Sequence, residues 1–171
     1  MGKSSLKAIA VDHFDTLKDA NTGHWSRDDL LWQVGLPLLC ALGSLSIGWY
    51  WRNPSSAVAG VSIVAALLCS MAVFLFQLRL ETHNIVDDRL GDRDYALLDQ
   101  TFFNVMWAIV VGLALALFLI VCEGLDVFQD DTLGKVLTAI AVFASAHFLT
   151  VIGMSLKRLR RAYERIAARK R

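Results

Sequence analysis

An ionisable residue lies deep in an apolar stretch near the end of the chain. His147 stands one helical turn before Thr150, and Ser145 lies beside it, all within the uncharged run 136–156. A charged imidazole is costly in hydrocarbon, so His147 predicts either a proton-sensitive switch or a neutral side chain that only packs, hydrogen-bonded to Thr150 or to a neighbouring helix. These two interpretations have equal weight.

A second uncharged run, 56–78, carries small and polar residues at intervals of three to four positions. Small side chains let helices approach closely, and hydroxyls can bond across a helix interface. The spacing therefore predicts a face covered by protein, either as an interface or as the wall of a polar path. Taken over both runs, the residues of this candidate path or interface are Ser62, Ser70, Gln77, Ser145, His147 and Thr150.

Sequence patterns typical of catalysis are absent. The chain contains no G-x-S-x-G, H-E-x-x-H, Walker or kinase pattern, and its three cysteines form no C-x-x-C pair. His83 stands near Glu81, Asp87 and Asp88, but an ordinary solvated surface accounts for these residues better than a metal site. We therefore expect no enzyme activity, no catalytic residue, no cofactor and no metal.

The final fifteen residues, 157–171, are strongly basic, with eight cations against Glu164. Beside a membrane such a cluster attracts anionic lipid headgroups, and the same charges would also suit a partner protein or, indirectly, nucleic acid. The simplest alternative is a positive charge that only sets membrane orientation. The candidate lipid- or partner-binding residues are Lys157, Arg158, Arg160, Arg161, Arg165, Arg169, Lys170 and Arg171.

The elements that must position these side chains are membrane helices. Of the 171 residues, 56% are hydrophobic and only 19% are charged, an excess over ordinary soluble domains. Four uncharged runs, 32–50, 56–78, 102–122 and 136–156, each have about the 20 residues that a helix needs to cross a bilayer. The sequence therefore predicts an all-α integral membrane protein with four transmembrane helices in 30–156, and it leaves no room for a sizeable soluble domain.

The distribution of Lys and Arg predicts the orientation. The segment 1–29, the connector 79–101 and the tail 157–171 hold 15 of these residues, whereas the other two connectors hold one each, Arg52 and Lys135. Positive flanks resist translocation, so both termini should lie in the cytoplasm. The N-terminal segment should form an amphipathic helix over 4–20, the connector should extend two spans as helices, and the tail should prolong the last span.

In its architecture the chain resembles small four-span bacterial inner-membrane proteins of antiphage defence systems. The likeness rests on the short amphipathic start, the run HFDTLKDANTGHWSRDDLLWQVGLPLL into the first span, the close spacing of the spans and the basic helical tail. It implies a homo-oligomer that either perturbs the membrane when triggered or holds a cytosolic partner there.

Two functional hypotheses follow. In the first, the chain is a channel-like or membrane-perturbing effector with the six path residues near its polar route. In the second, it is a non-conducting scaffold that recruits a cytosolic partner through its basic face. A third, purely structural interpretation treats the chain as an accessory subunit of a larger membrane protein.

Overall fold

The computed structural model describes residues 9–11, 13, 30–84, 92–128 and 131–169, and every regular element in these ranges is helical. A short π-helix, η1 (Leu31–Gly35), leads directly into α3 (Leu36–Ile47). The long helices are α4 (Ser55–Asn84), α5 (Asp92–Gly124) and α6 (Thr132–Arg169). The predicted all-α fold is confirmed for the described residues.

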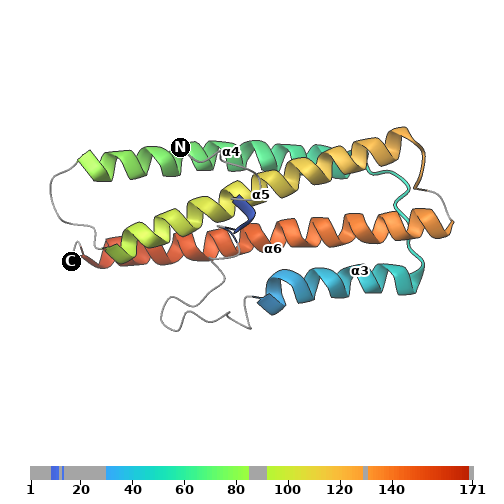
Figure 1. Ribbon diagram of the computed structural model, residues 1–171, viewed down its shortest axis with the longest axis horizontal. Helices are drawn as coiled ribbons and strands as arrows, with labels where there is room; N and C mark the ends of the chain where they lie inside the picture. Colours follow the sequence, from blue (N-terminus) through green and yellow to red (C-terminus); the bar gives the residue numbers. More distant parts are fainter. Residues whose placement is uncertain (1–8, 12, 14–29, 85–91, 129–130, 170–171) are drawn as a thin grey trace.

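The helices lie side by side in the order α4, α5, α6, α3 (Figure 1). Successive helices run in opposite directions, so α5 and α6 each have a helix on both sides, while α3 and α4 form the two edges. Segment 48–54 therefore passes from one edge to the other. On the way, the backbone N–H of Trp51 donates to Thr138 Oγ1 of α6 at 3.1 Å.

Three helical stretches are long and apolar enough to cross a membrane, namely Ser55–Leu80, Leu98–Gly124 and Thr132–Arg160. They indicate a multi-pass membrane protein. The first predicted span is shorter than the run 32–50 because helix α3 ends at Ile47. Gly48 follows with φ +68°, a left-handed conformation that glycine adopts without strain, and its N–H bonds to Leu45 O. The apolar helix Leu31–Ile47 is therefore about 25 Å long, somewhat less than the hydrocarbon thickness of about 30 Å.

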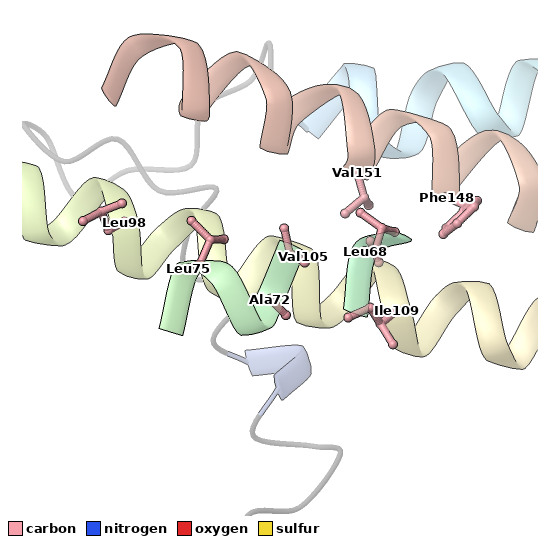
Figure 2. Close-up of a cluster of buried hydrophobic side chains, with 9 residues drawn as sticks. Leu68, Ala72, Leu75, Leu98, Val105, Ile109, Phe148 and Val151 are labelled. Carbon is pink, nitrogen blue, oxygen red and sulfur yellow. The ribbon is translucent and has the colours of Figure 1, made fainter. Parts of the chain in front are cut away.

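The central core lies where α4, α5 and α6 meet. In Figure 2, Leu68, Ala72 and Leu75 of α4 project towards α5, and Phe148 and Val151 of α6 complete the same buried cluster. Leucine and isoleucine side chains on the outer faces are exposed, which suits contact with lipid tails rather than water. Examples from each of the four helices are Leu39, Ile63, Leu117 and Leu149.

The predicted helical extensions are confirmed as far as the described residues reach. Helix α4 continues to Asn84, α5 begins at Asp92, and α6 runs without a break to Arg169. An ion pair between Arg79 and Asp99, 3.2 Å apart, joins the ends of α4 and α5. Of the predicted amphipathic helix over 4–20, only residues 9–11 and 13 lie within the described part, and these are helical.

Candidate functional site

A set of mostly polar side chains, buried or half-buried, lies between the N-terminal segment, η1, α5 and α6. We refer to it as the polar cluster, and its members are His13, Gln33, Asn104, Trp107, His147 and Met154. The side chains of His13, Gln33 and Asn104 are almost completely buried. Buried polar groups are tolerated only when they are hydrogen-bonded, so the contacts within the cluster determine how these elements fit together.

His13 connects the N-terminal segment to the helices. Its Nδ1 lies 2.8 Å from Asn104 Oδ1, and its Nε2 lies 3.1 Å from Gln33 Oε1. Its ring also stacks on Trp107, with the centroids 5.4 Å apart. The amide of Gln33 in turn donates from Nε2 to Met154 Sδ at 3.3 Å. One side chain from outside the apolar helices therefore bridges η1 and α5.

The surroundings of His13 favour its neutral form. Burial lowers the pKa of His13 from 6.5 to about 4, because the charged ring loses its hydration. Electrostatic interactions with His147 and Arg158 act in the same direction, whereas the hydrogen bonds to Asn104 and Gln33 favour the charged form. His13 is therefore uncharged at neutral pH while it is docked, and its single N–H donates to only one of the two amides, so the other amide must turn its NH2 group towards the bare ring nitrogen.

His147 is held in one tautomer by its two partners. Trp107 Nε1 donates to His147 Nε2 at 3.3 Å, and His147 Nδ1 lies 2.9 Å from the backbone carbonyl oxygen of Gln33. An indole N–H can only donate and a carbonyl can only accept, so the proton must be on Nδ1 and Nε2 must be bare. Protonating the ring would break the bond to Trp107.

Pro37 explains why the Gln33 carbonyl is available. In an α-helix this carbonyl would accept from the backbone N–H four residues later, and Pro37 has no N–H. The chain before Pro37 widens into the π-helix η1, in which the N–H of Leu36 bonds to Leu31 O, five residues back. His147 of α6 supplies the donor that Pro37 lacks.

This arrangement predicts coupling between Pro37 and His147. His147→Leu alone should lower the free energy of unfolding by about 1–3 kcal/mol, because it leaves the buried carbonyl of Gln33 without this donor. In a Pro37→Ala background the cost should be smaller by about 1 kcal/mol, since the substituted alanine has a backbone N–H for the same carbonyl. Reversible unfolding in detergent micelles measures both.

The second proline of the chain provides the control for this cycle. Pro54 lies in the segment before α4, outside the polar cluster, so Pro54→Ala and His147→Leu should have additive effects. Additivity in the Pro37 cycle as well would contradict the assignment of His147 as the partner of this carbonyl.

The residues predicted to form a polar path fall into two separate groups. Ser62, Ser70 and Gln77 are exposed on α4, and Ser70 Oγ donates to Ala66 O on its own helix at 3.3 Å. The other three are partly buried on α6, on the opposite side of α5. There, Ser145 Oγ donates to Ala141 O and Thr150 Oγ1 to His147 O, both at 2.8 Å.

The basic tail is only partly within the described side chains. Lys157 is exposed, and Arg160 pairs with Glu164 at 2.8 Å. Arg158, by contrast, is buried and lies near enough to His13 to influence its titration. The side chains predicted for the same surface that lie outside the described part are Arg161, Arg165, Arg169, Lys170 and Arg171.

Sequence reasoning did not select His13, Gln33 or Asn104. For His13 a signal exists, because it stands four residues after Ile9 and four before Leu17, on the apolar face of the predicted amphipathic helix. Gln33 and Asn104 are polar amides inside two of the uncharged runs. Only the fold shows that these three side chains meet.

The contacts of the cluster join the N-terminal segment to η1 and α5. Among the residues that the structure describes, no three His, Cys, Asp or Glu side chains gather as metal ligands. Comparisons with protein-family models, with curated proteins and with solved structures found no match to this chain.

Proposed function

We propose that the chain is an oligomeric bacterial inner-membrane protein that acts as a channel-like or membrane-perturbing effector of an antiphage defence system. In this proposal all four apolar helices cross the membrane and both termini face the cytoplasm. The three long apolar helices support a multi-pass arrangement. The charge asymmetry supports the orientation, and the resemblance of the run into the first helix to defence-associated proteins supports the role.

The observation that carries the proposal is the burial of His13 among the membrane helices. A segment that precedes the first apolar helix inserts an ionisable side chain with 0% exposure between η1 and α5. Buried polar contacts of this kind can hold two elements in one arrangement and release them when a partner or a proton competes. In our proposal the docked segment holds the protein in its resting state, and its release by a trigger activates it.

The exposed face of α4 supports assembly. Among the described helices, α4 lies directly beside α5 and has an edge position (Figure 1), and Ser62, Ser70 and Gln77 on it are exposed. A Gln side chain facing hydrocarbon is unfavourable unless a neighbouring helix offers it hydrogen bonds. A second copy of the chain would cover this face, and a conducting path would then form between copies.

Ion flux from liposomes tests the proposal. Wild-type protein should be nearly silent, and His13→Ala should raise flux at least tenfold because the resting contact is lost. Adding Ser70→Leu to His13→Ala should abolish this flux. Ser46→Leu is the matched control and should leave the flux of His13→Ala unchanged. Like Ser70, Ser46 is an exposed serine whose hydroxyl donates to a carbonyl of its own helix, Leu42 O at 2.8 Å, but it lies on α3. A sealed bilayer with His13→Ala, in a preparation with unchanged helix content, would refute the channel-like function.

One observation favours the second candidate function, a non-conducting scaffold. Ser70, Ser145, His147 and Thr150 all direct hydrogen bonds to groups of their own chain, so a single copy has less free polar surface than an aqueous path needs. The scaffold hypothesis predicts that Arg160→Glu releases a cytosolic partner from the membrane. Unchanged co-purification of partners in this variant, together with flux from His13→Ala, would favour the effector.

A further inference from the structure

A groove of about 550 Å³ lies along the junction of η1 and α3 with α6. Its shape and chemistry are those of a lipid site. Trp32, Leu36 and Cys40 line one wall, and Leu149, Gly153 and Lys157 belong to the other. This volume falls in the range of pockets that hold small ligands, about 300–1,000 Å³. The groove adjoins the polar cluster, because Gln33 and Met154 belong to both, but His13 and Asn104 do not line it.

Apart from the weakly polar thiol of Cys40, the side-chain polar groups of the groove bond within the protein, with one charged exception. Gln33 bonds to His13 and Met154, and Thr150 donates to the carbonyl of His147. The walls are otherwise apolar, and Trp32 and Leu149 are 64% and 65% exposed. The exception is Lys157, an exposed ammonium at one end of the groove. An occupant must therefore be apolar along its length and negative at one end.

The length of the groove matches one leaflet of a bilayer. On α6 it extends from Ala146 to Lys157, about 16 Å at 1.5 Å per residue. This is about half of the hydrocarbon thickness of about 30 Å. Lys157 also stands near the end of the apolar stretch Thr132–Arg160, where a lipid headgroup would lie. Basic pockets between transmembrane helices at this depth are typical sites for anionic headgroups.

We propose that this groove binds one anionic phospholipid of the inner leaflet, with an acyl chain between α3 and α6 and the phosphate on Lys157. Charge complementarity selects this occupant over a helix of a second copy, because an apolar helix would offer the Lys157 ammonium no counter-charge. The inference rests on the membrane location in the proposed function but not on ion conduction.

Native mass spectrometry of the purified full chain tests the site by titration with dioleoyl phosphatidylglycerol and, in parallel, with dioleoyl phosphatidylcholine. We expect one tightly held phosphatidylglycerol per chain. Lys157→Gln should weaken this binding about fivefold, the factor that corresponds to about one cationic contact near a membrane surface, and should leave phosphatidylcholine binding unchanged. Equal retention of the two lipids by the wild type would overturn the proposal.

Gly153→Leu tests the place of binding. A Cβ at Gly153 meets no atom within 4 Å, so a leucine there should fill the groove without disturbing the helices, and retention of both lipids should be lost. Gly60→Leu is the matched control, because a Cβ at Gly60 on α4 also meets nothing within 4 Å but lies outside the groove. Unchanged lipid retention in Gly153→Leu would overturn the proposal. The same holds if the wild type is a dimer that this variant disrupts, because a second copy of the chain would then occupy the groove. Because the readout is bound lipid, its failure is distinguishable from a failure of ion flux.

Discussion

Lowering the pH from 7 to 5 is expected to weaken the docking of the N-terminal segment about twentyfold. The pKa of His13 is about 4 when docked and 6.5 when free, so the released form binds the proton more tightly. The stabilisation from neutral His13 is complete above pH 6.5 and is lost as the pH falls from 6.5 to 4. The expected loss is about 2 kcal/mol at pH 5, and about 3 kcal/mol below pH 4, where docked His13 is protonated as well.

Hydrogen exchange measures this release. Protection factors of the backbone amides around His13, which are corrected for the intrinsic pH dependence of exchange, should fall between pH 7 and pH 5. The control is His13→Gln, whose amide can bond to Asn104 and Gln33 but does not titrate in this range. If His13→Gln loses protection to the same extent, another group is responsible for the effect. His147 would then need testing, since it lies close enough to influence His13 electrostatically, whereas Arg158 keeps its charge throughout this pH range.

Gly112→Ala is expected to destabilise the protein by about 2 kcal/mol, although alanine is the better helix former. A Cβ at Gly112 of α5 would lie 2.8 Å from Phe148 Cε2 and 3.1 Å from its Cζ, well inside normal contact. Phe148 is buried in the central core (Figure 2), so its ring has little room to move away. The contact of α5 with α6 therefore depends on the missing side chain. Thermal unfolding in detergent should give a clearly lower Tm.

Two further variants separate the clash from helix propensity. Gly60→Ala adds the same methyl group where nothing lies within 4 Å, so it should be neutral or stabilise by up to about 1 kcal/mol. Phe148→Leu removes the aromatic atoms that the new Cβ would meet. Combined with Gly112→Ala, it should therefore cost less than the two single variants added together. Equal effects of Gly112→Ala and Gly60→Ala would show that α5 and α6 do not pack as closely as described.

The long apolar helices follow from the composition of the sequence alone. The uncharged runs are long enough to require helices in a bilayer, because backbone groups in hydrocarbon must bond within their own segment. This accounts for α4, α5 and α6 where they coincide with the uncharged runs. Local chemistry that is visible in the sequence also ends α3 at Gly48, since glycine readily adopts the left-handed conformation. The run 32–50 had nevertheless predicted a longer helix.

The location of the polar side chains depended on tertiary structure. The spacing of Ser62, Ser70 and Gln77 predicts a common face of α4, and they do share an exposed side, but periodicity does not identify the neighbour. Likewise, Arg158 belongs to a run of cations in the sequence, yet it is buried while Lys157 beside it is exposed. Adjacent residues on a helix point about 100° apart, so the packing of α6 decides which cation reaches the surface.

The sequence by itself determined an all-α protein with long apolar helices, an uneven charge distribution and the absence of catalytic motifs. Only the tertiary structure brought His13, Gln33 and Asn104 together, over separations of 20 and 91 positions. Within its own segment each is an ordinary polar residue. A hydrogen bond depends on both partners and on the path of the chain between them, so neither segment alone predicts it. Pro37 illustrates the same dependence: the sequence indicates a missing N–H, and the fold determines that His147 supplies the donor in its place.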